Sequence, residues 1–467
     1  MGAGSAGCVL ARRLAEPGDR RVILVEAGDQ LEPTERMVDG WHVGQVPDWG
    51  YVNAADGAAL RRGRLVGGSS WFTRFAVRGH RADFDRWARL GIDGWGYDEV
   101  LTWFRRVEAD LEHGTEPWHG SDGPIPVTRY PALTRTPAHV AAIEALEARG
   151  FAAVDDVNRP DAVGVGPMPM NSRDGRRVTT FDAFLDGKDL PGLERRTGVV
   201  DRVQVQAGRA TGVRLSGGSL IRASTVVLAA GTYGSPTILL RSGIGPAIEL
   251  RALGIPVVAD LPGVGRNLAD HPAVDLDTGY AGPGVEGPAL HSIATFRSAG
   301  THPSEPPDLM FWVTDPEPPE PHFYLDPILL KPEARGTLRL RSRDASVPPV
   351  IDLPVPDRPR DVARLSEGYD LALEVMATRP LRTFLPTQLR TRPSQAELLA
   401  GAYSLPHVVG TCRMGPAAAD GAVVDDRCRV HGIDGLWIAD ASVLPEPPAG
   451  FPQLIVIALA ERVASWI

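Results

Sequence analysis

The stretch Met1-Gly2-Ala3-Gly4-Ser5-Ala6-Gly7 decides the fold of this chain. Gly2, Gly4 and Gly7 form a G-x-G-x-x-G pattern leading into a helix, and the apolar run Val22-Ile23-Leu24-Val25-Glu26 predicts a buried strand that ends in a carboxylate. Glycines let the backbone turn closely around a pyrophosphate, to which a helix N-terminus offers free N–H groups and partial positive charge. A carboxylate roughly 20 residues further on binds a ribose hydroxyl in such folds. The stretch therefore predicts a dinucleotide site in an α/β fold.

A strand should precede this glycine turn, but Met1 alone stands before Gly2. The first strand of a parallel sheet is normally covered on both faces, so a sheet cannot easily lose it. We therefore expect that the first strand of the sheet is missing from the chain as written. Either the true N-terminus lies upstream of Met1 or the fold is impaired, and an in-frame apolar run upstream would support the first explanation.

Composition and charge narrow the class of protein. With 467 residues, 43% of them hydrophobic, the chain can bury a large core in two or three domains. A net charge of −9 without a dense basic run argues against a nucleic-acid partner. The sequence has no apolar stretch of the roughly 18 residues that a membrane span needs. Three cysteines are too few, and odd in number, for a disulfide framework, which predicts a reduced, cytoplasmic setting.

Three later segments again combine glycine turns with apolar runs, as the opening stretch does. Gly67-Gly68-Ser69-Ser70 is a second glycine turn, with hydroxyl groups that can contact an anion or a ring. The run 225–230 predicts a buried strand that ends at Gly231, and an apolar helix is expected to begin near Ser235-Pro236. The tail 405–467 returns to short strands and glycine turns and closes on an apolar helix that starts at Leu454.

Residues 272–404 have a different character. Proline is dense in the segment 315–322, which excludes regular helix and interior strand there, and strand-like segments at 309–313 and 336–341 surround it. This part is interpreted as a mainly antiparallel β domain with a mobile proline-rich loop. The predicted division is a nucleotide-binding domain of residues 1–271 and 405–467 and a substrate-binding domain of residues 272–404.

Four blocks together resemble the glucose–methanol–choline (GMC) family of FAD-dependent oxidoreductases along nearly the whole chain. The blocks are Gly2–Gly7 with Glu26, Arg62–Gly79, Gly231–Pro246 with Leu261–His271, and His407–Gly415 with Gly432–Ala464. The third block, which starts Gly231-Thr232-Tyr233-Gly234-Ser235-Pro236, fits the second signature of the family position by position. A family member would carry an apolar strand ending in valine before the first turn, and Met1 stands at that valine.

The resemblance implies FAD as the cofactor and assigns residues to it. The ADP half would lie against the opening glycines and Glu26, the adenine against the backbone of Val200, and the pyrophosphate and flavin against the second glycine turn and Asp440. The full expected set is Gly2, Gly4, Ser5, Ala6, Gly7, Glu26, Ala27, Arg64, Val66, Gly67, Gly68, Ser69, Val200, Ala230, Gly231, Asp440, Ala441, Pro452 and Gln453. The segment 71–74 lacks a histidine that could bond to the flavin, so the FAD is expected to be non-covalent.

His407 matches the catalytic histidine of the family. A histidine suits the task because its ordinary pKa of about 6.5 lets it accept a hydroxyl proton at neutral pH, while hydride passes from the alcohol carbon to flavin N5. Gln453 stands where the family has a second active-site histidine or asparagine. The amide of glutamine still donates and accepts hydrogen bonds, but its side chain is one methylene longer than that of asparagine. The alternative role for Gln453 is a cap of the C-terminal helix.

Further side chains receive weaker assignments. His271 and His119 are expected to be structural, with a flavin-side position as the other possibility for His271. Cys428, His431 and Cys412 lack a second ligand pair, so no metal site is expected. Candidates for the substrate pocket are Trp71, Phe72, Arg74, Trp312 and Phe323, although aromatic residues in strands more often belong to the core.

The predicted function is FAD-dependent oxidation of a small-molecule alcohol at its CH–OH group, with His407 as base and oxygen or a redox carrier as electron acceptor. Two alternatives stay open. One is a lyase of the hydroxynitrile type that keeps FAD without net redox chemistry, and the other is an inactive FAD-binding relic, suggested by the missing strand and by Gln453. Sugars, sterols, choline-like and aryl alcohols are all substrates within the family, and the sequence does not choose among them.

Overall fold

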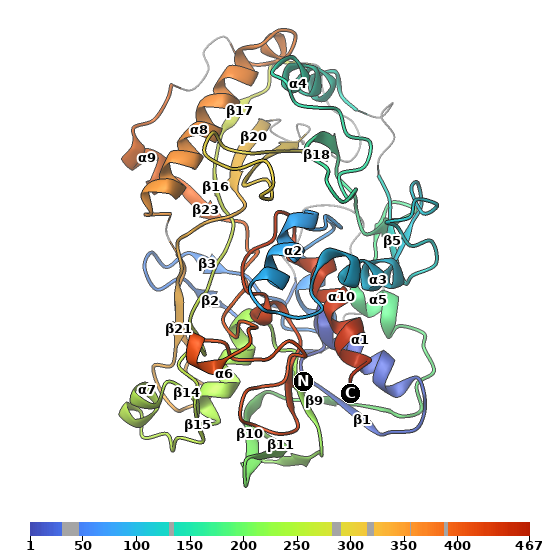
Figure 1. Cartoon of the computed structure of the whole chain (residues 1–467), viewed down its shortest axis with the longest axis vertical. Helices are drawn as coiled ribbons and strands as arrows, with labels where there is room; N and C mark the ends of the chain where they lie inside the picture. Colours follow the sequence, from blue (N-terminus) through green and yellow to red (C-terminus); the bar gives the residue numbers. More distant parts are fainter. Residues whose placement is uncertain (30–45, 130–134, 283–290, 315–321, 355, 387–390) are drawn as a thin grey trace.

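A computed structural model of the chain describes residues 1–29, 46–129, 135–282, 291–314, 322–354, 356–386 and 391–467. Both chain ends and strands β1 and β9 lie in the lower half of the molecule as drawn in Figure 1. An antiparallel sheet with helices α4 (Pro137–Ala148) and α8 (Pro359–Ala377) forms the upper half. No helix within the described ranges is both long and apolar enough to cross a bilayer.

Parallel strand pairs build the nucleotide-binding side. Strand β1 (Val22–Glu26) pairs with β9 (Leu193–Thr197), and β13 (Val226–Leu228) pairs with β24 (Leu436–Ile438). Helix α6 (Gly231–Arg241) follows β13 after a glycine turn, as α1 (Ser5–Ala15) precedes β1. The parallel strand pairs, with a helix next to a strand in each, confirm the predicted α/β class.

Met1 and Gly2 join the two parallel pairs. The backbone nitrogen of Met1 donates to the carbonyl of Val227 at 2.9 Å, and its carbonyl accepts from the N–H of Ala229 at 2.8 Å. On the other side, the N–H of Gly2 donates to the carbonyl of Val25 at 2.8 Å. The opening turn is thereby held between β1 and β13, while the upstream strand stays a prediction.

Helix α1 packs against the C-terminal helix α10 (Pro452–Ala464), close to the predicted start at Leu454. Arg13 of α1 forms an ion pair with Glu461 of α10 at 2.7 Å. The remaining helical segments within the described ranges are α2 (Arg81–Arg89), α3 (Tyr97–Val107), α5 (Thr180–Phe184), α7 (Ala247–Ala252) and α9 (Gln395–Ala400), with short 3-10 turns at Gly68–Trp71, Leu381–Phe384, Ala418–Asp420 and Ala441–Val443.

Short strand pairings surround these layers. They are β2 (Tyr51–Val52) with β3 (Ala59–Leu60), β4 (Glu108–Asp110) with β5 (Ile125–Val127), β7 (Ser172–Arg173) with β8 (Arg176–Arg177), the antiparallel set β10 (Val200–Gln206), β11 (Arg209–Leu215) and β12 (Leu220–Arg222), β14 (Ile244–Gly245) with β15 (Ala259–Asp260), and β21 (Thr337–Arg339) with β22 (Val350–Asp352).

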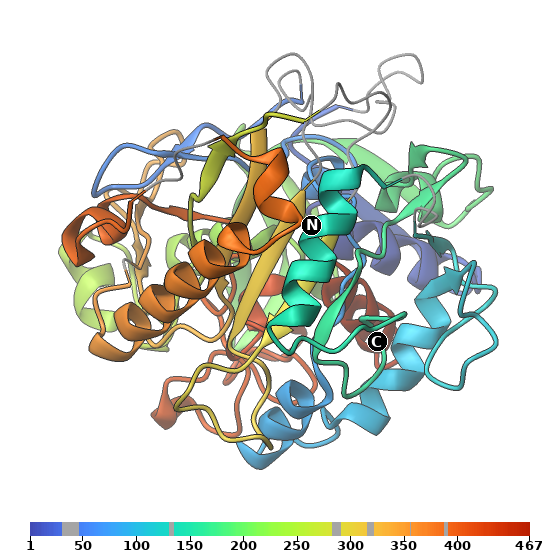
Figure 2. The same ribbon diagram turned by 90° about the horizontal axis from the view of Figure 1, so that it is seen from above.

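The second layer is an antiparallel sheet with strand order β23-β16-β20-β19-β18-β6, and β17 pairs with β20. Its strands are β6 (Gly164–Pro167), β16 (Pro272–Val274), β17 (Asp277–Gly279), β18 (His291–Phe296), β19 (Leu309–Thr314), β20 (His322–Leu329) and β23 (Ala402–Ser404). Seen from above, α4 and α8 lie across one face of this sheet (Figure 2). The sheet confirms the predicted antiparallel β domain, but the proline-rich segment lies outside the described residues up to 321.

The two faces of this sheet belong to different hydrophobic clusters. Because side chains alternate along a strand, Leu309, Phe311 and Val313 of β19 pack under the helices. Met310 and Trp312 belong to a different cluster on the opposite face. The helix-covered face is core, which leaves the opposite face to border a cavity.

The predicted domain division stays a prediction, and some segments bond across it. Strand β6 precedes residue 272 and yet pairs with β18 over Gly164–Pro167. Conversely, Gly336 and Leu268 exchange backbone hydrogen bonds of 2.7 and 3.2 Å, and Leu338 belongs to the core of the nucleotide-binding side. We propose that residues 137–177 belong with the substrate-side sheet and residues 335–354 with the nucleotide-binding core.

Candidate active site

The two glycine turns pack directly on each other. The N–H of Gly67 donates to the carbonyl of Ala3 at 2.7 Å, and a Cβ added to Gly68 would lie 2.7 Å from the Cα of Gly4. Gly2 has a φ of +87°, and a Cβ on it would lie 2.3 Å from the carbonyl oxygen of Ala229. Glycine is therefore required at these positions by close backbone approach as well as by conformation.

Glu26 sits at the end of β1, among backbone N–H groups. Its carboxylate accepts from Ala3 at 2.6 Å and from Gly28 at 3.0 Å, and the N–H of Ala27 lies beside it. Burial raises the pKa of Glu26, which these N–H groups oppose. Val200 starts β10 two residues after Gly198, whose N–H donates to the carbonyl of Glu26 at 2.6 Å. The predicted ribose and adenine contacts are thus brought to one sheet edge.

A cavity of about 720 Å³ connects the N-terminus of α1 with His407. Half of the predicted cofactor and catalytic residues line it: Ser5, Ala6, Ser69, Ala230, Gly231, His407, Asp440, Ala441, Pro452 and Gln453. The other half is not among the lining residues: Gly2, Gly4, Gly7, Glu26, Ala27, Arg64, Val66, Gly67, Gly68 and Val200. Among these, Arg64 is exposed, with its guanidinium 5.1 Å from the ring centre of Trp49.

Asp440 and Gln453 each bind across the site. The Asp440 carboxylate accepts from the Gly231 N–H at 2.9 Å and from the Ser235 hydroxyl at 2.5 Å. Gln453 lies in the first turn of α10, where its Oε1 accepts from the hydroxyl of Ser5 at 2.9 Å. The N-cap of α10 is Phe451, so Gln453 ties this helix to the dinucleotide turn and does not cap it.

His407 reaches the cavity from the loop after β23. Its backbone N–H donates to Asp270 at 2.7 Å, and its Nδ1 lies 3.1 Å from Nδ1 of His271. Burial, His271 and Arg62 together hold the pKa of His407 well below its usual 6.5. The imidazole is therefore neutral at physiological pH and able to accept a proton.

The predicted pocket side chains divide into two groups. Phe72 and Trp312 line the cavity. Trp71 and Arg74 are buried away from it, and Phe323 belongs to the core beneath the helices. On strand β20 the alternate residues His322, Tyr324 and Asp326 line the cavity instead, as do Trp49, Tyr51, Arg62, Tyr233 and Tyr403, which sequence reasoning missed. Alternation along β20 could have separated two faces, but it could not say which of them borders the site.

The dinucleotide end of the cavity fits a pyrophosphate. The N-cap of α1 is Gly4, so no side chain occupies the free N–H groups of the first turn. A Cβ at Gly4 would meet nothing nearer than the Gly68 Cα at 3.9 Å, and one at Gly231 would meet nothing within 4 Å. With the Glu26 carboxylate at the ribose position, these residues fit the ADP half of FAD.

Oxidation of an alcohol by hydride transfer needs a cofactor ring near the substrate carbon and a proton acceptor near its hydroxyl group. This cavity runs from a dinucleotide turn to a neutral histidine, and so the fold and the site define a dinucleotide-dependent oxidoreductase. The GMC oxidoreductase N-terminal profile matches residues 1–273 and the C-terminal profile matches residues 332–460. The chain belongs to the GMC oxidoreductase family.

Relatives of known activity cover the entire chain. It is 32% identical to 5-(hydroxymethyl)furfural oxidase of Methylovorus sp. (strain MP688), over 100% of this chain and 97% of that protein. It is 30% identical to an oxygen-dependent choline dehydrogenase of Sinorhizobium medicae (strain WSM419), over 100% and 94%. The crystal structure of pyridoxine 4-oxidase from Mesorbium loti superposes with a TM-score of 0.90 at 30% identity, over 100% and 97%.

The family and these relatives establish FAD as the cofactor and alcohol oxidation as the activity, with a small-molecule substrate and an electron acceptor. Neither the lyase alternative nor the inactive relic is favoured by these relatives. The residues that would hold FAD here are the two glycine turns, Glu26 and the cavity wall at Gly231 and Asp440.

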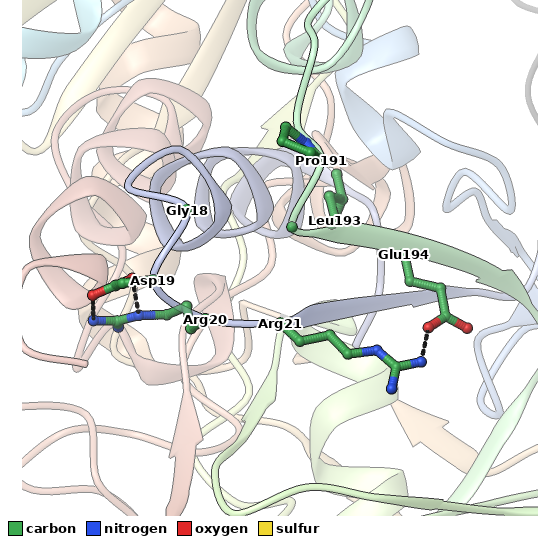
Figure 3. A pocket seen from close by; sticks show the side chains of 8 residues that line it. Gly18, Asp19, Arg20, Arg21, Pro191, Leu193 and Glu194 are labelled. Atoms are coloured by element: carbon green, nitrogen blue, oxygen red, sulfur yellow. Dashed lines mark hydrogen bonds and ion pairs between the residues drawn. The ribbon is translucent and has the colours of Figure 1, made fainter.

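A second hollow, of about 460 Å³, lies at the amino ends of β1 and β9 (Figure 3). Its charged side chains are already paired, Arg20 with Asp19 at 3.0 Å and Arg21 with Glu194. Ligands of open α/β sheets bind at the carboxyl ends of the strands. This hollow therefore lies outside the dinucleotide site.

A buried cluster elsewhere has ligand atoms at metal-binding spacing. One atom each of Glu108, Asp110 and His119 lies within 4.8 Å of the others. Arg78 pairs with Glu108, and Arg129 pairs with Asp110 and Asp156 at 2.9 Å each. His119 bonds Glu108 through Nδ1 at 2.7 Å and Asp156 through Nε2 at 3.0 Å. Two guanidinium groups and an imidazolium balance three carboxylates, which makes the cluster an ionic network of the fold.

The His119→Ala variant should lower the free energy of unfolding by about 3–5 kcal/mol, because it leaves two guanidinium groups to balance three buried carboxylates and removes the hydrogen-bond partner of Glu108 and Asp156. Burial would lower the pKa of His119, but Asp156 and Glu108 raise it above 6.5. This contribution is therefore complete below pH 6.5 and is lost as pH rises through the raised value. Urea unfolding from acid to alkaline pH measures it. His302→Ala, at an exposed histidine, is the control. If His119→Ala lowers the free energy of unfolding by no more than this control does, the prediction is wrong.

Proposed function

We propose that the substrate is a primary alcohol attached to an aromatic or heteroaromatic ring. The observation that carries this proposal is the aromatic wall beside His407. The ring centre of Phe451 lies 4.5 Å from that of His407, and Trp312 lies 5.0 Å from Phe75 and 5.9 Å from Phe451. A flat ring gains both burial and aromatic contact against such a wall. Relatives named for 5-(hydroxymethyl)furfural and for pyridoxine support the proposal, since both compounds are alcohols of heteroaromatic rings.

His407 is the proposed base. It takes the proton from the hydroxyl oxygen while a hydride leaves the carbon that bears this oxygen, so that the O–H and C–H bonds break and a C=O bond forms. FAD, when bound, accepts that hydride at flavin N5. The side chains around the cavity position the alcohol between His407 and the flavin. The neutral state of His407 supports this role, because a protonated imidazole has no lone pair to offer.

Gln453 is proposed to orient the substrate hydroxyl. Its Oε1 is taken by Ser5, which leaves its amide N–H groups as donors on the cavity wall. The cofactor-binding set given above stands as part of this proposal, with FAD held non-covalently. Dioxygen is the proposed acceptor and leaves as hydrogen peroxide, which the oxidase and oxygen-dependent names of the relatives support. The cytoplasmic setting stays a prediction, and the three cysteines are buried and unpaired.

To test this, the purified holoenzyme is mixed under anaerobic conditions with one compound at a time, and the flavin absorbance is followed. The compounds are benzyl, furfuryl and pyridyl alcohols, choline and glucose. The ring-bearing alcohols should bleach the flavin at least about tenfold faster than choline and glucose. Equal bleaching by choline would overturn the substrate class and leave the oxidation intact. Acid precipitation should release the flavin into solution, and flavin that stays with the precipitate would contradict non-covalent binding.

A further inference from the structure

Two histidines meet behind the cavity wall. The Nδ1 atoms of His271 and His407 are 3.1 Å apart, and the two ring planes are nearly perpendicular at 84°. His407 lines the cavity, whereas His271 is fully buried and does not. Any effect of His271 on a substrate must therefore pass through His407.

The backbone around the pair fixes both rings. The Asp270 carboxylate accepts the N–H of His271 at 2.8 Å and that of His407 at 2.7 Å. The carbonyl of His271 accepts the N–H of Leu405 at 3.2 Å. One carboxylate thus anchors both histidine backbones, so the contact between the rings is built into the loop structure.

Each ring of the pair carries a single ring proton. Burial, with Lys331 nearby, lowers the pKa of His271 to about 3, and that of His407 is also depressed. The charged groups near the pair are Lys331, Arg62 and Asp270, and burial raises the pKa of Asp270 to about 6. Two neutral imidazoles that share one Nδ1–Nδ1 contact must take opposite roles, one donating and the other accepting.

The surroundings of His271 decide which ring donates. The backbone carbonyls of Pro448 and Leu330 lie beside its imidazole and favour an N–H there. Its Nε2 is buried without a partner at full hydrogen-bond geometry among the described residues. A carbonyl oxygen attracts an N–H and repels a lone pair. The proton of His271 therefore belongs on Nε2, and its Nδ1 is the acceptor.

We propose that His271 is a positioning residue that accepts a hydrogen bond from Nδ1–H of His407 and thereby keeps Nε2 of His407 free to take the hydroxyl proton of the substrate. The opposite tautomer would present an N–H to the alcohol and supply no base. This inference rests on the proposed role of His407 as base.

Nitrogen NMR of histidine-labelled holoenzyme tests the tautomer without any turnover. The His407 signals are assigned by their loss in His407→Asn, and near pH 8 they should show a protonated Nδ1 and an unprotonated Nε2. A protonated Nε2 would overturn the inference. Because this readout needs no substrate, it stands even if the proposed alcohol oxidation fails.

Two variants test the consequence for the reaction. His271→Leu removes the acceptor, and kcat should fall about ten- to hundredfold with KM within about twofold. His271→Asn places an amide oxygen near the same point, so it should keep most of kcat and the parent tautomer. Equal losses in the two variants at equal FAD content would reduce His271 to a packing residue. If His271→Leu does not fold, the tautomer in the parent and in His271→Asn decides.

Discussion

His407→Asn should slow the reduction of bound flavin by an aryl alcohol by about 10²- to 10⁴-fold, the range for loss of a general base. Asparagine keeps a polar side chain on the cavity wall but cannot accept a proton at neutral pH. His407 is outside the set of residues proposed to hold FAD, so FAD content should equal that of the parent. Rapid mixing without oxygen measures the rate, and flavin absorbance per chain provides the control.

The pH dependence gives the same assignment a second test. Because burial, His271 and Arg62 depress the pKa of His407 below 6.5, the base form is lost only as pH falls through that lower value. The parent rate of flavin reduction should therefore change little between about pH 6 and pH 8. A variant that reduces flavin as fast as the parent would remove His407 from the mechanism. A parent rate that drops tenfold over this interval would show that its pKa is not depressed.

Gly7→Ala should leave the purified protein with little or no FAD. A Cβ on Gly7 would lie 1.7 Å from the carbonyl oxygen of Gly2, inside the turn proposed to hold the pyrophosphate. Backbone must move to relieve such a contact, at a cost of at least about 1–3 kcal/mol. Helix propensity predicts the opposite sign, since alanine is favoured over glycine by about 1 kcal/mol inside a helix such as α1. FAD content and the melting temperature of the purified variant measure the result.

Gly217→Ala is the matched control for this substitution. It adds the same methyl group at a glycine that has no neighbouring atom within 4 Å. Its FAD content and melting temperature should equal those of the parent. A Gly7→Ala protein that carries as much FAD as Gly217→Ala would mean that the turn relaxes without losing its cofactor.

Several features of the site were predicted because they depend on short-range rules. A glycine pattern beside an apolar strand specifies its own turn, so the sequence located the opening turn and Glu26. The helix that follows β13 and the C-terminal helix were predicted from apolar patterns alone, and both are confirmed, although the first begins at Gly231 and not near Ser235. The predicted roles of His407 and Asp440 came with the resemblance, because both lie inside family blocks, and these roles remain proposals.

The residues that line the cavity were harder to predict from the sequence. Phe323 and Trp312 are both aromatic residues in strands, but Phe323 points under the helices and Trp312 toward the site. Arg62 lines the cavity, whereas Arg64, which was predicted to bind the cofactor, does not. Along a strand, neighbouring residues point to opposite faces, and which face borders the cavity depends on the elements that cover the other one.

The sequence by itself determined the α/β class, the dinucleotide turn, the family and the histidine expected to act as base, since each is encoded in a contiguous run of residues. Only the tertiary structure decided that His271 meets His407 and that Gln453 binds Ser5, contacts that span 136 and 448 positions of the chain. Such contacts depend on how separate loops and helices pack. A local pattern of residue types carries no record of that packing, and so the fold alone places the partners of the base.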